Sequence, residues 1–143
     1  MIYIKDIMVR DVKTVHPKMS VRRAAEIMAR SRIGSVVVIE KGKPAGILTE
    51  GDISRAVARG TDLSSCSVRE LMSRNLVTIG PEARVEEAAK LMAEAKVKKL
   101  PVVENGKLVG IITQTDIVAI TFDLVTVLKE MVAARYRPPE FQP

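Results

Sequence analysis

Apolar residues along the chain form two kinds of pattern, a helical spacing and a pair of continuous apolar runs, and each pattern occurs twice. In residues 21–28 they fall at i, i+3, i+4 and i+7, which is typical of a helix with one narrow apolar face, and residues 85–92 repeat this pattern. Two apolar runs separated by a polar, glycine-containing turn follow each predicted helix, over residues 36–48 and 100–112. Runs of β-branched residues on either side of such a turn predict a β-hairpin. The pattern therefore predicts a helix followed by a hairpin, twice.

The two halves of the chain are copies of one another. Residues 4–53 align with residues 68–117 at a constant offset of 64 without a gap, and 18 of the 50 pairs are identical. In each copy a short strand precedes the helix, and a second helix begins after the hairpin, at Thr49 or Thr113. We therefore predict an α/β (mixed α+β) fold of two β-α-β-β-α repeats. Because a unit of about 60 residues buries too little surface to be stable alone, the repeats are expected to pack together with pseudo-twofold symmetry.

The predicted organisation has four parts, which are a first repeat over 1–60, a linker over 61–67, a second repeat over 68–120, and a C-terminal helix extension and tail over 121–143. Between Ile117 and Val132 the chain carries more apolar residues than a helix lying on one small core needs. Large exposed apolar patches usually mark interfaces, so a homodimer is expected. The Arg137-Pro138-Pro139 segment is expected to end the helix and leave a short tail.

Composition excludes several classes of protein. Of the 143 residues, 47% are hydrophobic and 28% are charged, which provides enough apolar surface for a packed core. The longest uncharged stretches fall far short of the roughly 18 apolar residues of a membrane span, and no secretory signal pattern is present. We therefore expect a cytoplasmic protein. One cysteine, Cys66, and one histidine, His16, exclude an internal disulfide and a structural zinc site, so no metal site is expected.

A Thr-x-x-Asp motif opens the last helix of each repeat, as Thr49-x-x-Asp52 and Thr113-x-x-Asp116. A threonine followed three residues later by an acid caps a helix N-terminus, and this structural role alone explains the spacing. The aspartate also has two acceptor oxygens, which suit the two hydroxyl groups of a ribose. The threonine can cap the helix while the aspartate faces a crevice between the repeats, so both roles remain open.

These motifs resemble a tandem pair of cystathionine β-synthase (CBS) domains, the unit called a Bateman module. The resemblance covers residues 4 to about 120, and its motifs occur twice in the same order. They are Ile7-Met8 and Leu71-Met72, the Thr-hydrophobic-x-Pro segments at 14–17 and 78–81, Leu100-Pro101-Val102-Val103, and Gly46-Ile47-Leu48-Thr49-Glu50-Gly51-Asp52 with Gly110-Ile111-Ile112-Thr113-Gln114-Thr115-Asp116.

The resemblance implies a function in regulation. Such modules bind adenosine-containing ligands, such as AMP, ADP, ATP, NAD(H) or S-adenosylmethionine, in crevices between the repeats, and they usually regulate a fused enzyme or transporter. Since this chain of 143 residues leaves no room for such a domain, the resemblance implies a stand-alone sensor. Its ligand is expected to be an adenine nucleotide, with AMP the first choice, and no catalytic cofactor is expected.

The resemblance also implies two binding sites, each built from both repeats. One site would contain Thr14, Val15, Ser35, Val36, Lys98, Lys99, Ile111, Thr113, Thr115 and Asp116. Its pseudo-twofold mate would contain Ile47, Thr49, Asp52, Thr78, Ile79, Leu100 and Pro101, together with Lys99 shared across the crevice. The first copy has Gly34, Ser35 and Gly51 where the second has Lys98, Lys99 and Thr115. The site containing Asp116 is therefore expected to bind a phosphorylated ligand more tightly.

Catalysis has little support in the sequence. The chain has no phosphate-binding loop, no His-Glu-x-x-His and no Gly-x-Ser-x-Gly motif, and no catalytic residue is expected. The net charge of +6 leaves a nucleic-acid-binding adaptor as an alternative, and a purely structural interaction module is a third reading. The basic residues are scattered along the chain rather than gathered in one arm. The salt dependence of binding distinguishes the nucleotide sensor from the nucleic-acid adaptor, because the affinity for nucleic acid falls steeply as the salt concentration rises.

Overall fold

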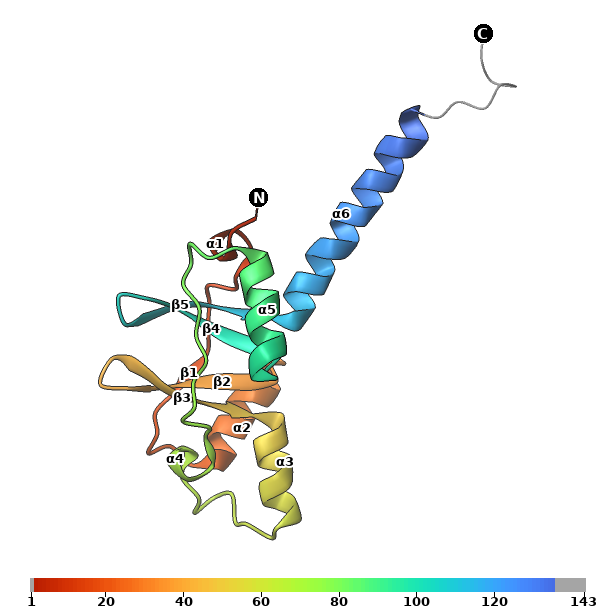
Figure 1. Ribbon diagram of the computed structural model, residues 1–143. Helices are drawn as coiled ribbons and strands as arrows, with labels where there is room; N and C mark the ends of the chain where they lie inside the picture. The colour runs from red at the N-terminus through yellow and green to blue at the C-terminus, as the bar shows by residue number, and fades with distance from the viewer. Residues whose placement is uncertain (1, 136–143) are drawn as a thin grey trace.

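The computed structural model describes residues 2–135 and shows the predicted duplication (Figure 1). The first half contains α1 (Ile4–Ile7), β1 (Thr14–Val15), α2 (Val21–Ser31), β2 (Ser35–Glu40), β3 (Lys43–Thr49) and α3 (Glu50–Ala58). The second half contains α4 (Val68–Leu71), α5 (Val85–Ala95), β4 (Lys99–Glu104), β5 (Lys107–Thr113) and α6 (Gln114–Arg135). The prediction of a mixed α/β fold with two repeats is confirmed.

The two sheets differ in one strand. In the first repeat β1 runs parallel to β2, and β2 pairs antiparallel with β3, so the strand order is β1-β2-β3. The second repeat forms only the β4-β5 hairpin, and the predicted strand that ends at 78–81 is reduced to a single parallel bridge between Ile79 and Val102. The sequence predicted a short strand here, and that prediction was wrong, because the backbone of this segment pairs with β4 at Ile79 alone.

Both hairpins turn through two residues with positive φ. These are Lys41 and Gly42 in the first repeat, at φ 52° and 78°, and Asn105 and Gly106 in the second, at 52° and 77°. Two left-handed residues in succession match the right-handed twist of the flanking strands. The polar, glycine-containing turns therefore predicted both hairpins correctly. The two hairpins lie alongside each other and point in the same direction (Figure 1).

Each repeat begins with a short helix that packs on the other repeat. The backbone N–H groups of Ile4 and Lys5 in α1 donate to carbonyl oxygens of Ala83 and Pro81, at 2.8 and 3.0 Å. By the same symmetry, Val68 and Arg69 in α4 donate to Met19 and Pro17, at 2.8 and 3.0 Å. The chain therefore crosses between the repeats at both starting segments, and neither repeat is completed by its own residues alone.

The crossover leaves two hydrophobic cores. The first contains Val68 and Met72 of the second copy among first-repeat residues such as Ala24 and Leu48. The second contains Ile4 and Met8 of the first copy among second-repeat residues that include Ala88, Met92, Leu100 and Ile112. Ala24 of α2 and Ala88 of α5 are fully buried, as expected for helices packed closely on a sheet, whereas Ala25 is half-buried and Ala89 is exposed.

Helix α6 extends far beyond the two cores (Figure 1). Ile117 packs against the second core, whereas eight large apolar residues further along the helix are exposed, namely Val118, Phe122, Leu124, Val125, Val127, Leu128, Met131 and Val132. The predicted helix end at Arg137-Pro138-Pro139 and the tail lie outside the described residues. Across residues 2–135, no helix has the length and apolar character needed to cross a membrane.

Candidate functional site

A cavity of about 430 Å³ lies where the first repeat meets the start of α6. The second repeat contributes Ile111, Thr113, Thr115 and Asp116 at the end of β5 and the first turn of α6. Lys99 enters from β4. The first repeat contributes Val9, Asp11, Val12, Lys13, Arg32, Ile33, Gly34, Ser35 and Val37. We call this the Asp116 cavity.

Asp116 combines a cap with an oxygen that has no protein partner. Its Oδ2 accepts a 2.9 Å hydrogen bond from the backbone N–H of Thr113, and the N–H of Asp116 donates to Thr113 Oγ1 at 3.2 Å. These bonds satisfy free N–H groups at the start of α6, as the capping interpretation predicts. Within residues 2–135, Oδ1 of Asp116 accepts no hydrogen bond and therefore remains available to a ligand in the cavity.

The pseudo-twofold mate is a cavity of about 600 Å³ at the start of α3. It is lined by Gly34, Ile47, Thr49, Glu50, Gly51, Arg55, Lys96, Val97, Lys98 and Lys99. We call this the Thr49 cavity. Both volumes fall in the range of about 300–1,000 Å³ that small-molecule sites occupy.

The aspartate next to the Thr49 cavity is already engaged. Asp52 Oδ2 accepts from the backbone N–H and from Oγ1 of Thr49, at 2.9 and 3.0 Å. Its Oδ1 accepts a 2.8 Å hydrogen bond from Arg55, and the carboxylate is only 18% exposed. Asp52 is not among the residues that line the cavity, whereas Arg55 is. The two Thr-x-x-Asp motifs are therefore alike as caps but differ in what they offer a ligand.

Lys99 lies between the two cavities and lines both of them. Partial burial lowers the pKa of its ammonium group below the ordinary value, and the nearby Glu50 carboxylate opposes this shift. The other cations of the two cavities, namely Lys13, Arg32, Arg55, Lys96 and Lys98, are exposed. A charge withdrawn from water interacts more strongly with a ligand anion than an exposed charge does. Lys99 is therefore the strongest candidate for neutralising a phosphate.

The structure gathers six of the ten residues predicted for the first site. Ser35, Lys99, Ile111, Thr113, Thr115 and Asp116 all line the Asp116 cavity. Thr14 lines a separate hollow near the hairpin turns, with Arg10 and Lys107. Val15 and Val36 are buried in the first core, and Val37 faces the cavity instead. Successive side chains of a strand point to opposite faces of its sheet. The predicted residue, Val36, therefore faces the core, and its neighbour Val37 faces the cavity.

Lys98 belongs to the mate cavity rather than to the first. It lines the Thr49 cavity together with Lys96, Val97 and Lys99. The cations lining the Asp116 cavity are instead Lys13, Arg32 and Lys99. The expected advantage of the Asp116 site counted Lys98, Lys99 and Thr115 in its favour; Lys99 and Thr115 line this cavity, whereas Lys98 does not.

Of the residues predicted for the mate site, Ile47, Thr49 and Lys99 line the Thr49 cavity. Leu100 is fully buried in the second core, and Ile79 packs against that core. Pro101 is also fully buried, and Thr78 is exposed, with neither lining the cavity. Thr78, Ile79, Leu100 and Pro101 match binding positions by motif, but Ile79, Leu100 and Pro101 pack in the interior and Thr78 is exposed outside the cavity.

Sequence reasoning named Ser35, Lys98 and Lys99 in the loops that precede β2 and β4 but missed the other residues of these loops. Residues 32–35 line the Asp116 cavity, and residues 96–99 line the Thr49 cavity. The offset of 64 relates the two loops, and each faces the Thr-x-x-Asp motif of the other copy. That symmetry was a usable signal, because applying it to whole loops assigns Lys98 to the Thr49 cavity.

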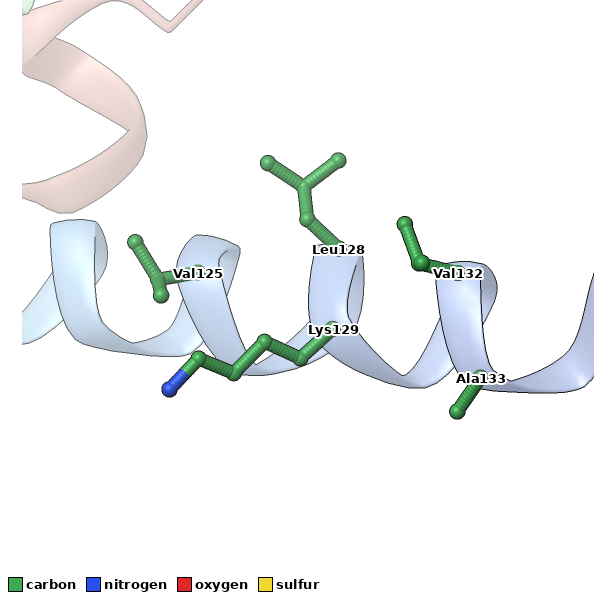
Figure 2. A pocket seen from close by; sticks show the side chains of 5 residues that line it. All are labelled: Val125, Leu128, Lys129, Val132 and Ala133. Atoms are coloured by element: carbon green, nitrogen blue, oxygen red, sulfur yellow. The ribbon is translucent and has the colours of Figure 1, made fainter. Parts of the chain in front are cut away.

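A further hollow of about 460 Å³ lies along α6 and is lined by residues of that helix alone (Figure 2). Val125, Leu128 and Val132 point to one side of the helix, and Lys129 supplies the one charged group among its lining residues. Without convergent polar groups, this surface does not resemble a nucleotide site.

Other reactive groups do not form a site in the part of the chain that the structure describes. No group of three or more metal-ligating side chains occurs within residues 2–135. Burial raises the pKa of the Cys66 thiol, which makes it a weaker nucleophile. His16 accepts a hydrogen bond at Nδ1 from the backbone of Lys18, which fixes it in a local turn.

Comparisons with known proteins agree with this architecture. The CBS domain-containing protein YhcV of Bacillus subtilis is 37% identical over 115 residues, covering 80% of this chain and 81% of that protein. Inosine-5'-monophosphate dehydrogenase of Korarchaeum cryptofilum is 39% identical over 110 residues, which are 76% of this chain but 22% of the dehydrogenase. This second similarity is therefore confined to a minor part of a longer enzyme.

A solved structure gives the same result. The CBS domain pair of protein MJ0100, in complex with 5'-methylthioadenosine and S-adenosyl-L-methionine, has a TM-score of 0.78 and 29% identity, covering 85% of this chain and 96% of that chain. The family model of the CBS domain matches residues 4–59 and 68–123, which together exceed half of the sequence. The chain therefore belongs to the CBS domain family and carries two CBS domains in tandem.

Proposed function

We propose that this protein is a regulatory module that binds an adenosine-containing ligand between its two CBS domains. The observation that carries the proposal is the free Oδ1 of Asp116 at a cavity of about 430 Å³ that cations also line. A carboxylate oxygen accepts a hydrogen bond from a ribose hydroxyl, and a neighbouring cation neutralises a phosphate. The two kinds of group occur together where the repeats meet.

An adenine nucleotide fits this combination better than an uncharged nucleoside. Lys13, Arg32 and Lys99 bring three positive charges to the Asp116 cavity, against the two carboxylates of Asp11 and Asp116. The first turn of α6 adds the Thr115 hydroxyl and backbone N–H groups, which favour anions. Apolar contacts from Val9, Ile33 and Ile111 would hold the base. We propose AMP as the ligand, since one phosphate suffices for these cations.

The complex of MJ0100 supports the ligand class. That CBS domain pair binds 5'-methylthioadenosine and S-adenosyl-L-methionine, both of which contain adenosine. We propose that this chain likewise binds its ligand without transforming it, and that occupancy changes its contact with a regulated protein. A second copy of the chain is proposed to cover the exposed apolar residues of α6.

Calorimetric titration of the full chain tests the proposal with AMP, ADP, ATP, NADH, S-adenosylmethionine and adenosine. We expect saturable binding of AMP, weaker binding of adenosine, and no consumption of AMP during incubation. A single-stranded oligonucleotide is the comparison for the adaptor alternative, and its binding would fall steeply between about 50 and 200 mM salt. Failure of all adenosine compounds to bind at millimolar concentration would contradict the proposal.

A further inference from the structure

One cation serves both cavities. Lys99 lines the Asp116 cavity and the Thr49 cavity, and Gly34 is the other residue that lines both. A Cβ placed on Gly34 would lie 3.0 Å from Lys99 Nζ and 3.4 Å from Glu50 Oε2. The ammonium therefore occupies the space beside Gly34, where the missing side chain leaves room between the two cavities.

The symmetry of the repeats explains why this cation has no counterpart. The position that matches Lys99 in the first copy is Ser35, which lines the Asp116 cavity only. Gly34 matches Lys98, so the first copy brings neither of the two lysines to the junction. The structure thus gives the two cavities one partly buried cation that lines both of them, while the other cations that line them are exposed.

A single ammonium cannot serve two phosphates equally well. Its hydrogen bonds and most of its field go to the nearer anion, and a charge-assisted bond is about twice as strong as a neutral one. Glu50 lines the Thr49 cavity beside Lys99, so a lysine drawn toward the Asp116 cavity leaves Glu50 to repel an anion in the Thr49 cavity. Both effects disfavour a second phosphate once the first is bound.

We propose that Lys99 couples the two cavities, so that a phosphorylated ligand in the Asp116 cavity weakens the binding of a second phosphorylated ligand in the Thr49 cavity. This inference rests on the proposed binding of adenine nucleotides. At low ligand concentration the module then binds one nucleotide, in the Asp116 cavity. Filling the Thr49 cavity with a second nucleotide requires a higher concentration. A neutral adenosine compound escapes the antagonism because it does not compete for the ammonium.

The test follows each cavity separately by NMR, with AMP as the probe and the isotopically labelled full chain. The Thr115 amide reports the Asp116 cavity and the Gly51 amide reports the Thr49 cavity, since each residue lines only one of them. Disabling the Asp116 cavity with Asp116→Ala should shift the Gly51 titration to AMP concentrations about 5-fold lower or more, within the usual range of coupling between sites. With adenosine, the Gly51 curve should shift by less than twofold.

Two lysine variants assign the coupling. In a Lys99→Gln background, adding Asp116→Ala should leave the Gly51 curve unchanged within twofold. In a Lys98→Gln background the shift should persist, because Lys98 lines the Thr49 cavity alone. A shift that persists without Lys99 would assign the antagonism to direct repulsion between phosphates and overturn the proposal.

The outcomes separate this inference from the proposed function. If AMP moves both amides but Asp116→Ala leaves the Gly51 curve in place, the cavities are independent and the coupling is wrong, while nucleotide binding stands. If neither amide responds to AMP or adenosine, nucleotide binding itself fails and the coupling with it. Lys99→Arg keeps the charge and should retain the shift, which excludes misfolding as the reason for its loss in Lys99→Gln.

Discussion

Arg55 donates a 2.8 Å hydrogen bond to Asp52, and this bond separates two motifs that look identical in the sequence. The matching pair in the second repeat is Ala119 and Asp116, so the second aspartate has no arginine on the next turn of its helix. Asp52 has both oxygens engaged, whereas Asp116 keeps Oδ1 open. Ribose recognition is therefore expected at Asp116 first, for a reason different from the lysine count.

The first prediction concerns the ribose contact. Asp116→Ala should weaken AMP binding by about 10- to 150-fold, because losing a hydrogen bond to a charged group costs about 1.5–3 kcal/mol. Asp52→Ala should weaken the tighter binding step by less than threefold, since this carboxylate is held by Arg55 and Thr49. Calorimetry on both variants and the wild type measures the difference.

The matched control keeps the cap. Asp116→Asn retains an oxygen that can accept from the Thr113 N–H but removes the charge, so its unfolding midpoint should stay near the wild-type value while AMP affinity falls. Equal losses of affinity in Asp116→Ala and Asp52→Ala would contradict the assignment of ribose to Asp116.

A second prediction tests the crossing of the chain between repeats. A Cβ on Gly46 would lie 2.6 Å from the backbone oxygen of Ser73, and on Gly110 it would lie 2.5 Å from Met8 Sδ. Gly46→Ala should lower the free energy of unfolding by about 1–3 kcal/mol, since the backbone oxygen cannot move without breaking the Ile47–Ser73 bridge. Gly110→Ala should cost less, because the nearest backbone atom to its added Cβ, the oxygen of Val9, lies 3.0 Å away, and the closer Met8 belongs to a flexible side chain.

Urea unfolding of these variants gives the comparison. Gly80→Ala is the control, because no atom lies within 4 Å of its added Cβ, and it should stay within about 0.5 kcal/mol of wild type. If Gly46→Ala and Gly80→Ala have equal free energies of unfolding, the close approach of Gly46 to the Ser73 backbone does not limit stability.

Much of the fold followed from local patterns in the sequence. The i, i+3, i+4 spacing predicted α2 and α5, and the two apolar runs with a glycine-containing turn between them predicted the β4-β5 hairpin. The hydrogen bonds that define these elements join residues near one another in the chain, such as Lys99 and Thr113 in the hairpin. The crossing of α1 and α4 was not predicted, because Ile4 and Val68 find their partners only once both repeats are assembled.

The site was predictable at its motifs and less so between them. Thr113 and Asp116 lie at a helix start, where capping chemistry fixes the local geometry. Val36 and Val37 lie on opposite faces of β2. Because both are valine, the sequence does not show which of them faces the cavity. The resemblance implied that Lys99 is shared between the two sites. This sharing depends on the reach of a long side chain beside Gly34, which spacing along the chain alone does not show.

The third prediction concerns stability in acid. A hydrogen bond from Arg69 holds the pKa of Glu40 below its ordinary value, and this pair joins the end of β2 to α4 of the other copy. A lowered pKa in the folded state means that the pair contributes stability above pH 4.5, the ordinary value, and loses it as the pH falls through the folded pKa. Wild type should therefore be more stable than Glu40→Gln at pH 7.

This difference should shrink as the pH falls below 4.5 and vanish once Glu40 is protonated in the folded state. Chemical unfolding of wild type and Glu40→Gln at pH 7, 4.5 and 3 measures it. Arg69→Met in the same series should remove the pH dependence of the difference, because the charged partner is gone. A gap between wild type and Glu40→Gln that stays constant down to pH 3 would show that the ion pair does not supply it.

The last prediction is that two chains associate through α6. Phe122 is 70% exposed and Leu128 is 50% exposed, and the charged residues from 118 to 132 are Asp123, Lys129 and Glu130. A helix that is apolar on most of its faces is normally buried, so leaving it in water would be costly. The mass by light scattering at micromolar concentration should therefore be twice that of one chain.

Charge placed on this surface should separate the chains. Leu128 lines the hollow in Figure 2, and Leu128→Glu would desolvate a carboxylate in any interface that covers it. We expect this variant to have the mass of a single chain at concentrations where wild type is dimeric. Ala93→Glu adds the same charge to an exposed position of α5 and should leave the dimer intact. A wild-type monomer would contradict the predicted association, and a dimer that both variants leave unchanged would place the contact between chains elsewhere than on α6.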